Sequence, residues 1–442
     1  MMNKKRNKFA AKLPAILIFS LLLIPFCSYA DDTAALQAKL NAGNVVLTAG
    51  AKYTVTGLSV SHALNMNGAT ITMTGASNAC IKLTAAGASV TNGTVTGTWS
   101  NTTAGNAYGA LGVRILADNC AITNMVVTAV PAYGILVGPY NKPVITGCTI
   151  SNTGYIGVYY DSEANTTGGT FSNNTIDRSM LPATTIQQGA VMIRASTATT
   201  NFVTTGWTIT NNIFKMPYAP SNSANECMEI RWIANSTVSG NTFTNGSIGC
   251  SVVRGTNVTV TGNKFDGQSL EGIEFADCTT SNTTADVITR GLGVGILMDG
   301  SIGCTGTLIK NDQISGTTSD CIHAYLNTQQ VTVTGCTLVA GKGARGMNLQ
   351  KTTGVSITNT TFNGNSAGTL AVLLDTCPGD LTINGGAISN FTSCVVSIYS
   401  ATSGLINNVT MSNVKVTNVP KALQTTLSNG ATLGSNVVVV NH

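Results

Sequence analysis

The sequence predicts an all-β protein folded as a parallel β-solenoid of about 13–14 coils, with a short capping helix at its N-terminal end. A strand-like phrase recurs along most of the chain, and a turn signal lies at a fixed place between its copies. The composition agrees with this reading, because only 9% of the 442 residues are charged while 43% are hydrophobic. Intrinsic disorder requires the opposite balance of charge and hydrophobicity and is therefore excluded.

The recurring phrase consists of a small residue, an aliphatic residue, a variable residue and another apolar residue. Its second and fourth positions are apolar while the third varies, which is the period-2 pattern of a strand with one buried face. Successive copies are most often about 23 residues apart. The copies begin at Cys80, Gly112, Gly134, Gly157, Ala190, Cys227, Cys250, Gly272, Gly295, Cys321, Gly346, Ala371 and Cys394.

A second phrase places a turn inside each interval. It reads aliphatic, any residue, Asn or Gly, two residues of any kind, then apolar, with Asn92, Asn211, Gly262, Gly335 and Asn359 at its third position. Asn and Gly accept a left-handed backbone at low cost, so the chain is expected to bend at the same point of every coil. Helical repeats are excluded by the density of Gly, Asn and β-branched residues. Separate β-sandwiches would not keep one register from residue 80 to 397.

The first thirty residues have the pattern of a secretory signal peptide. Five of the 23 basic residues fall within the first twelve positions, before an apolar run over residues 13–26 and the small-residue end Ser28-Tyr29-Ala30. We expect a signal peptide over 1–30, an N-terminal cap over 31–57 and a β-helix domain over 58–442. Cleavage would leave 23 − 5 = 18 basic and 18 acidic residues. The mature chain would then have no net charge, no membrane anchor and no basic face for nucleic acid, and would be secreted, periplasmic or held at the cell surface.

The segment after the predicted cleavage site indicates a capping helix. Asp32 is a good N-cap residue, and Ala35, Leu36 and Leu40 supply apolar positions at helical spacing. Such a helix would cover the open end of the solenoid, where an uncapped parallel edge invites strand addition.

This segment also resembles the opening of a known family. The stretch Asp31-Asp32-Thr33-Ala34-Ala35-Leu36-Gln37, followed by Val45-Val46-Leu47-Thr48-Ala49-Gly50-Ala51-Lys52-Tyr53, is similar to the start of the right-handed parallel β-helix, pectin-lyase-like superfamily. That superfamily often has Pro where Thr48 stands. The resemblance implies a right-handed, single-stranded parallel β-helix over essentially the whole mature chain. Its members include polysaccharide lyases, glycoside hydrolases, pectin esterases, phage tailspikes and surface adhesins, so it leaves the activity open.

The outward positions of the strands concentrate the few charges on one face. Arg194, Arg231 and Arg254 occupy the expected fifth position of successive coils, so they should stack at about 4.8 Å with Glu229 beside them. Such a ladder favours the carboxylates or sulfates of an anionic polysaccharide, which Arg can bind through two hydrogen bonds. A solvated network of ion pairs is the alternative interpretation.

Acidic residues on the same face suggest catalysis. Glu274 and Asp299 should have Cα atoms about 8 Å apart, which suits paired carboxylates in glycoside hydrolysis. In β-elimination of a uronic acid, Arg254 or Arg231 would instead remove the proton, and Ca²⁺ or a second Arg would hold the substrate carboxylate. Three further acids, Glu226, Glu271 and Asp320, precede the small first position of their coils. We predict catalytic roles for Arg254, Glu274, Asp299 and His323, and substrate-binding roles for Arg194, Glu229, Arg231, Asp320 and Tyr325.

Together these residues predict a secreted polysaccharide-active β-helix, a lyase or glycoside hydrolase acting on an anionic polysaccharide. The alternative is a non-catalytic glycan-binding protein of the adhesin type. The sequence lacks a Gly-His-Gly followed by Arg-x-Lys, a close Asp-Asp pair on this face, and the multi-Asp calcium cluster of pectate lyases. It therefore indicates no dedicated metal site, and Ca²⁺ stays an open cofactor.

The cysteines predict stacked thiols. The mature chain would keep 11 of the 12 Cys, without a C-x-x-C or zinc spacing. Cys227 and Cys250 occupy the same expected position on adjacent coils, with Cα atoms about 4.8 Å apart, which is within disulfide range. We expect a pair of free thiols rather than a bond, because parallel side chains give an unfavourable dihedral angle.

Overall fold

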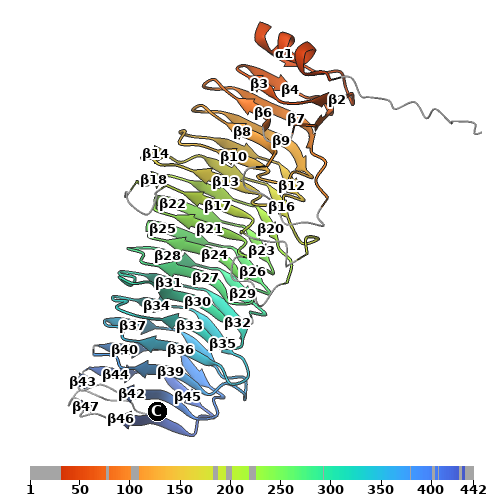
Figure 1. Ribbon diagram of the computed structural model, residues 1–442. Helices are drawn as coiled ribbons and strands as arrows, with labels where there is room; N and C mark the ends of the chain where they lie inside the picture. The colour runs from red at the N-terminus through yellow and green to blue at the C-terminus, as the bar shows by residue number, and fades with distance from the viewer. Residues whose placement is uncertain are drawn as a thin grey trace, which may run out of the picture. The chain divides into compact units, whose positions relative to one another are not determined.

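The computed structural model describes residues 31–75, 79–100, 109–182, 188–195, 202–218, 225–291, 293–378, 380–400, 404–406, 408–427 and 431–433. The predicted signal peptide, residues 1–30, lies outside the described residues. Within the described ranges, no helix is long and apolar enough to cross a membrane. Residues 31–442 form one compact unit, in which the coils follow one another in chain order (Figure 1).

The first element is the helix α1 (Thr33–Ala42), as predicted. Leu36 and Leu40 are buried and face the first coil, whereas Ala35 is exposed. Asp32 stands at the N-cap position, but its side chain does not cap the helix. The Asp32 carboxylate instead accepts a hydrogen bond from the Thr54 amide, at 2.9 Å, and so ties the start of the helix to the first coil.

One parallel sheet of fifteen strands contains all thirteen copies of the strand phrase. The structure adds β3 and β46 at its two ends, where the phrase is too degenerate to recognise. The fold prediction is therefore confirmed. We call this sheet the fifteen-stranded sheet; in order, its strands are β3 (Leu58–Val60), β6 (Ala79–Leu83), β8 (Leu111–Ile115), β10 (Ile135–Val137), β13 (Val158–Asp161), β17 (Val191–Arg194), β21 (Met228–Arg231), β24 (Ile248–Val253), β27 (Glu271–Ala276), β30 (Val294–Asp299), β33 (Asp320–Ala324), β36 (Arg345–Gln350), β39 (Leu370–Asp375), β42 (Cys394–Ser400) and β46 (Lys421–Leu427).

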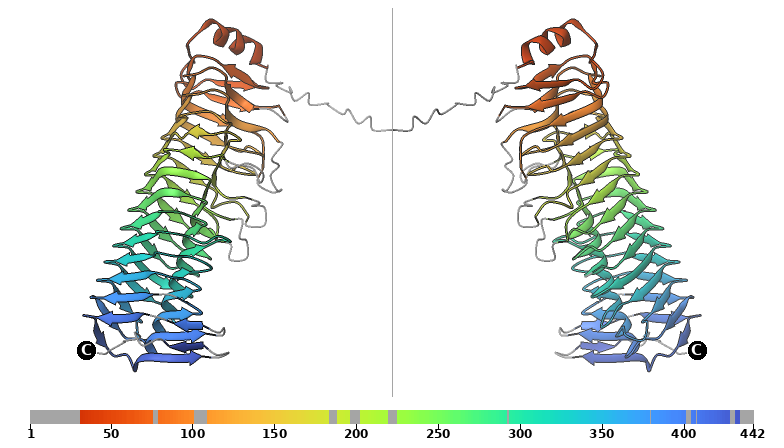
Figure 2. Two further views of the ribbon diagram at one scale, coloured as in Figure 1. Left: turned by 90° about the vertical axis from the view of Figure 1, so that its left-hand side faces the viewer. Right: turned by 90° about the vertical axis from the view of Figure 1, so that its right-hand side faces the viewer.

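The rest of each coil contributes to a second parallel sheet of thirty short strands, which lie side by side in both views of Figure 2. A small separate pair, β43 (Gly404–Ile406) and β47 (Ala431–Leu433), lies outside both sheets. The thirty strands are β1 (Val45–Val46), β2 (Lys52–Val55), β4 (Ala63–Asn65), β5 (Thr70–Met73), β7 (Ser89–Thr96), β9 (Ala121–Thr128), β11 (Val144–Thr146), β12 (Thr149–Ser151), β14 (Thr166–Thr167), β15 (Thr170–Ser172), β16 (Thr175–Asp177), β18 (Thr204–Thr205), β19 (Thr208–Thr210), β20 (Ile213–Lys215), β22 (Ile233–Ser239), β23 (Thr242–Thr244), β25 (Thr256–Thr261), β26 (Lys264–Asp266), β28 (Asn282–Thr284), β29 (Val287–Thr289), β31 (Leu308–Lys310), β32 (Gln313–Thr317), β34 (Thr332–Thr334), β35 (Thr337–Ala340), β37 (Val355–Thr358), β38 (Thr361–Asn363), β40 (Leu381–Asn384), β41 (Ala387–Ser389), β44 (Val409–Ser412) and β45 (Lys415–Thr417).

The turn predicted within each coil is present. Asn92, Asn211, Gly262, Gly335 and Asn359 all have positive φ angles, between 48° and 67°. The bend directs the chain from one short strand of the second sheet into the next. Its recurrence keeps every coil in the same path, which explains why one register persists along the molecule.

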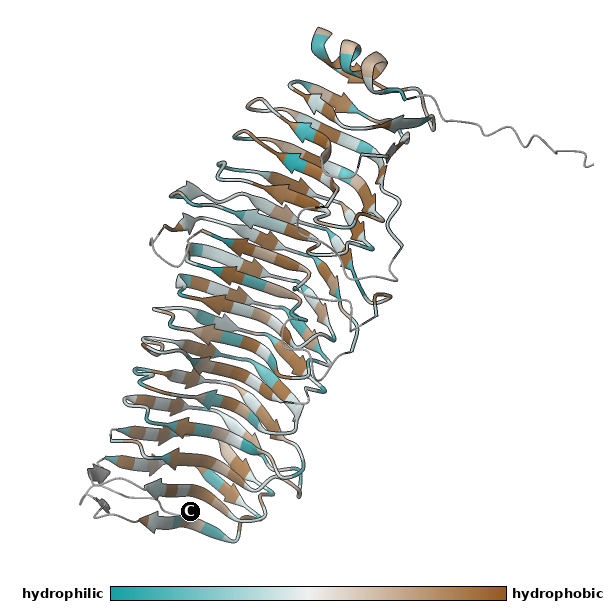
Figure 3. Ribbon diagram, in the orientation of Figure 1, coloured by the Kyte–Doolittle hydropathy of each residue, from teal (hydrophilic) through white to brown (hydrophobic). Residues whose placement is uncertain are grey.

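The core between the sheets is aliphatic, with one stack of aromatic rings. Hydrophobic residues recur on the strands of successive coils (Figure 3) and are almost fully buried. The rings of Phe214, Phe243 and Phe265 stack in parallel, with centroids 4.7 and 4.6 Å apart. Each coil therefore packs the same kind of side chain on the same kind of neighbour, so burial depends on the adjacent coils.

A line of buried polar side chains runs under the turn, one residue after its left-handed position. We call Asn174, Asn212, Asn241, Asn263, Asp286 and Asp312 the asparagine ladder. In this ladder each side-chain Oδ1 accepts a hydrogen bond from the backbone amide of the preceding coil, at 2.7–2.9 Å. The four Asn side chains also donate to a backbone carbonyl, at 2.9–3.0 Å. The buried backbone groups of the turn are thereby satisfied.

The register differs from the predicted one on two coils, at Cys394, where Val396 and not Val395 pairs with Val372, and at Cys250. Met228 pairs with Cys250, and Cys250 pairs in turn with Ile273. The small first residue of this coil is therefore Gly249, and Cys250 stands at the second, inward position. Cys250 mimics either position because it is both small and apolar. The prediction that Cys227 and Cys250 stack at one position is wrong for this reason; both are free, buried thiols.

Candidate functional site

A hollow of about 560 Å³ lies on the outward face of the fifteen-stranded sheet. It extends over five coils, from β17 to β30. Its floor includes Met192, Ser251 and Val253, while six charged or titratable side chains surround it. These six are Arg194, Glu226, Glu229, Arg231, Glu274 and Asp299. We call this depression the hollow.

Two arginines meet on one carboxylate at one side of the hollow. Arg194 and Arg231 are in register on adjacent strands, as predicted. The Nη2 atoms of Arg194 and Arg231 lie 3.5 and 2.8 Å from separate oxygens of Glu229, whose side chain is only 7% exposed. The arginine side chains are each about one-third exposed (31% and 32%). The Glu229 carboxylate therefore offsets the repulsion between the two guanidinium groups, while the outer surfaces of both arginines still face solvent.

Glu226 is the most unusual acid in the hollow. Burial raises its pKa to about 8, and the nearby carboxylates of Glu229 and Glu274 raise it further than the two arginines lower it. At neutral pH this carboxyl is therefore mainly protonated, which allows it to donate a proton or a hydrogen bond.

Glu274 and Asp299 lie on adjacent coils in the predicted relation. Ala276 pairs with Asp299, so Asp299 stands one coil and two residues beyond Glu274. Burial raises the pKa of both carboxyls, although the Ser251 hydroxyl donates a hydrogen bond to Glu274 that favours its ionised form. Asp299 Oδ1 is buried with no hydrogen-bond partner among the described residues. Both carboxyls thus face the hollow with unused hydrogen-bonding capacity.

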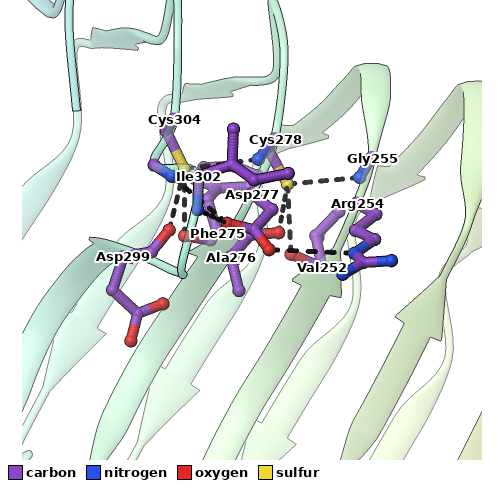
Figure 4. Close-up of polar contacts among 11 residues, drawn as sticks. Val252, Arg254, Gly255, Phe275, Ala276, Asp277, Cys278, Asp299, Ile302 and Cys304 are labelled. Atoms are coloured by element: carbon purple, nitrogen blue, oxygen red, sulfur yellow. Dashed lines mark hydrogen bonds and ion pairs between the residues drawn. The ribbon is translucent and has the colours of Figure 1, made fainter. Parts of the chain in front are cut away.

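The prediction of a three-arginine ladder is wrong at Arg254. Because the coil begins at Gly249, Val253 is the residue paired with Arg231, and Arg254 lies in the following turn with φ 52°. Arg254 faces Asp277 (Figure 4), with Nε 3.7 Å from the carboxylate, and its guanidinium lies 5.2 Å from the Trp232 ring centroid. Arg254 does not line the hollow.

His323 belongs to a second polar cluster on the next coils. Asp320 is fully buried and forms an ion pair with Arg345, with Nη2 at 3.1 Å. It also lies 3.4 Å from His323 Nδ1, while Asn348 Nδ2 lies 3.3 Å from His323 Nε2. Burial lowers the pKa of His323, and the Arg345 charge opposes its protonation as well. This cluster continues the outward face beyond β30, but it does not line the hollow.

Tyr325 stands beside this second cluster. Its ring centroid lies 5.8 Å from that of His323, in an edge-to-face arrangement. The two predicted binding residues Asp320 and Tyr325 therefore lie close to the predicted catalytic His323. The structure separates all three from Glu274 and Asp299 by the step from β30 to β33.

Several residues of the two sites were missed by the sequence reading. Ser251 was hidden by the misplaced register, since the outward residue of that coil was taken to be Val252. Arg345 and Asn348 carried no motif. Arg345 is polar at a place where most coils are apolar, whereas Asn348 occupies the variable outward position and does not stand out. The sequence showed Glu226 as an acid before its strand, but not that it is buried. Its burial depends on residues of neighbouring coils, so the sequence around Glu226 does not reveal it.

The described part of the chain contains no group of three or more His, Cys, Asp or Glu side chains placed to hold a metal ion. The acids of the hollow are distributed over several coils, and two of them, Glu229 and Glu274, interact with arginine and serine respectively. These residues do not resemble a preformed Ca²⁺ cage, which uses six to eight oxygen ligands.

Residues 204–338 match the family model described as a right handed beta helix region. No curated protein matches the chain significantly. Solved structures with similar folds include the Dettilon tailspike protein (14% identity, TM-score 0.48, 84% of this chain and 65% of that one). Others are the A-module of a mannuronan C-5 epimerase of Azotobacter vinelandii (12%, 0.42, 92% and 96%) and the surface adhesin PfbA of Streptococcus pneumoniae (12%, 0.46, 87% and 88%).

The chain thus spans slightly less than two-thirds of the tailspike's length. The parallel pairing of successive coils agrees with the match over residues 204–338. The chain is thus a parallel β-solenoid, of which residues 204–338 match the model of a right handed beta helix region.

Proposed function

We propose that the hollow binds an anionic polysaccharide and hydrolyses one of its glycosidic bonds. The observation that carries this proposal is a protonated Glu226 beside the shared Arg194–Glu229–Arg231 group. A neutral carboxylic acid next to a cationic binding group is what acid-catalysed cleavage of a charged sugar chain requires.

The charge balance favours an anionic substituent at the arginine side of the hollow. Glu229 neutralises only one of the two arginine charges, and a protonated Glu226 adds none. One positive charge remains on two partly exposed guanidinium groups. A substrate carboxylate or sulfate there would accept charge-assisted hydrogen bonds.

The chemistry assigns complementary roles to the acids. Glu226 donates its proton to the glycosidic oxygen as the bond to the anomeric carbon breaks. The Glu274 carboxylate, held by Ser251, accepts a proton from the attacking water or forms the glycosyl ester, and Asp299 positions that water. His323, Asp320 and Tyr325 would contact sugar units further along the chain.

Hydrolysis is favoured over β-elimination by the position of Arg254. In the lyase hypothesis Arg254 was a candidate base, but it lies outside the hollow and interacts with Asp277 and Trp232. Arg231 lines the hollow, but its guanidinium is already engaged in an ion pair with Glu229. Neither arginine is placed as a free base.

The test is incubation of the protein with polygalacturonate, alginate, hyaluronan and dextran sulfate. New reducing ends without ultraviolet absorbance from an unsaturated product support hydrolysis, whereas such absorbance supports a lyase and overturns the hydrolase proposal. Binding without any product supports the adhesin-type alternative. Absence of both binding and cleavage across the panel removes the functional proposal altogether.

The matched variants are Glu226→Gln and Glu163→Gln. Glu226→Gln keeps the shape of the side chain but removes the transferable proton, so turnover should fall by about 10²–10⁴-fold while binding persists. Glu163 is exposed on another part of the coil, and its replacement should leave turnover unchanged. Equal activity of the two variants would show that Glu226 is not the acid.

A further inference from the structure

Three tyrosines form an aromatic cluster beside the hollow. Tyr133 and Tyr159 stack with ring centroids 5.3 Å apart and planes 18° apart. Tyr155 meets Tyr133 edge to face, at 5.5 Å. Only 6% of the residues are aromatic, so three rings in mutual contact at the surface are a marked local enrichment. We call Tyr133, Tyr155 and Tyr159 the tyrosine cluster.

The cluster is anchored to the protein from below. Tyr133 packs on a small buried group formed by Ala79, Leu111 and Ala132. All three tyrosine rings remain partly exposed rather than buried. The rings are therefore held in place by packing and by one another, so a ligand that contacts them would lose little side-chain entropy.

The strand register places the cluster at the edge of the hollow. Tyr159 on β13 pairs with Met192 on β17, and Met192 pairs with Glu229 on β21. Met192 lines the hollow. The Tyr159 Cα thus lies one inter-strand step, about 4.8 Å, from a residue of the floor and two steps from Glu229.

The stacking with Tyr133 covers one face of the Tyr159 ring. Tyr133 comes from the preceding coil, next to β10, and covers the ring face on that side. On the other side, Met192 is the partner of Tyr159 on the next strand, and Arg194 is close enough for its charge to act on the Tyr159 hydroxyl. A flat apolar surface with a polar edge therefore borders the cationic part of the hollow.

We propose that Tyr159 forms a stacking subsite for one sugar ring of a polysaccharide bound in the hollow. Pyranose rings present a face of C–H groups, which packs on aromatic carbon, while their hydroxyls stay in contact with water and with polar neighbours. The ring on Tyr159 would precede the unit whose anionic group is held by Arg194 and Arg231. This inference rests on the proposed function for the identity of the ligand. It adds the position of one sugar-binding subsite and the direction in which the polymer crosses the strands.

The experiment measures binding of alginate, polygalacturonate, hyaluronan and dextran sulfate to the full protein by affinity electrophoresis. Replacing Tyr159 with Ala should weaken binding of the uronic-acid polymers by about five- to tenfold. Tyr159→Phe should bind as the natural protein does, because the ring is kept. Tyr399→Ala is the matched control. Tyr399 is 41% exposed on β42 of the same sheet, seven strands beyond β21 in the direction away from the cluster, so its replacement should change nothing.

A second variant guards against loss of folding. Tyr159→Leu places at this position the residue found at the paired position 136, so it should fold, as judged by circular dichroism, and still lose affinity. Unchanged affinity of both Tyr159→Ala and Tyr159→Leu overturns the subsite even if hydrolysis is observed. Loss of affinity in these variants with no cleavage by any protein supports the subsite and overturns the hydrolase proposal. If no polymer binds the natural protein, both are overturned.

Discussion

The asparagine ladder and the hollow both contain carboxyl groups removed from water, but they satisfy them differently. In the ladder, neighbouring coils supply a donor for each Oδ1 and, below the four Asn residues, a carbonyl for each amide nitrogen. In the hollow, the acids lie on outward strand positions and have few partners: one serine for Glu274, and two arginines for Glu229. The ladder is closed to solvent, and the hollow is open to it.

The difference is clearest at Asp286. The side-chain amide nitrogen of Asn263 donates a hydrogen bond to the Val238 carbonyl. In Asp286 the corresponding atom is Oδ2, and it has no partner among the described residues. Burial, together with the Asp312 carboxylate, raises the pKa of Asp286 to about 7. A proton on Asp286 would restore the missing donor. A raised pKa costs stability in the ladder. Under the proposed function, the raised pKa of Glu226 would instead serve acid catalysis, because a substrate can reach a carboxyl in the hollow and cannot reach one in the ladder.

The largest expected effect is that of Asp286→Asn on stability at alkaline pH. The unfolded carboxyl loses its proton near its ordinary pKa of 3.8, and the folded one near 7, so the protein loses stability as pH rises between these values. The loss amounts to about 4 kcal/mol, since each unit of pKa difference corresponds to about 1.4 kcal/mol. Urea unfolding should therefore show the Asn variant to be more stable by about this amount at pH 8, and nearly equal at pH 4.

The control for this comparison is Asp266→Asn. The Arg290 side chain lowers the pKa of Asp266 through a charge-assisted hydrogen bond, so this carboxylate stabilises the fold above its ordinary pKa and the benefit is lost in acid. Its replacement should lower stability at pH 8, the opposite sign to Asp286→Asn. If Asp286→Asn is instead destabilising at pH 8, the carboxyl is ionised in the folded state and the ladder tolerates its charge.

The next effect is on ligand affinity at Arg231. Arg231→Ala should weaken binding of an anionic polymer by about 1.5–3 kcal/mol, the range for a charged hydrogen bond. Unfolding stability should fall by only about 1 kcal/mol, because Glu229 keeps Arg194 as a partner. Ile230→Ala, one residue away and fully buried, should reverse the pattern, with about 2–5 kcal/mol lost in stability and the affinity of the folded protein retained. Unchanged binding by Arg231→Ala would reduce the arginine pair to a solvated ion-pair surface.

The smallest effect is expected at Arg254. Since Arg254 lies in the turn with Asp277 and Trp232, Arg254→Ala should leave turnover within about twofold and cost no more than about 1 kcal/mol of stability. Steady-state rates and urea unfolding provide the two measurements. A large loss of turnover would place Arg254 in the chemistry after all and would favour the lyase hypothesis.

The repeat was predictable because each coil must present the same apolar residues to its neighbours. Asn211 and Gly262 revealed the turn, since their backbone conformation restricts the residue type. The ladder position that follows was less visible. Asn212 and Cys336 both occupy it, because each side chain can donate a hydrogen bond to a backbone carbonyl of the preceding coil.

The candidate site was only partly predictable. Arg194 and Arg231 pair as expected, because the spacing between their coils was read correctly. Arg254 was misplaced by one residue, since Cys250 resembles the small first residue of a coil. In a strand a shift of one residue exchanges the inward and outward faces, so one ambiguous Cys removed Ser251 from view and brought Arg254 in. The protonation of Glu226 depends on burial by other coils, which the sequence does not display.

The eleven buried cysteines have a consequence for how the molecule opens. They are distributed from Cys80 to Cys394, and none is exposed. Burial raises the pKa of Cys80, Cys321 and Cys336 to about 12, so these thiols are almost unreactive while their coils are closed. A thiol reagent can therefore modify each of them only during a local opening. Labelling rates read by mass spectrometry would report opening free energies at many points along the solenoid, and would show whether it frays from its ends or separates as a whole.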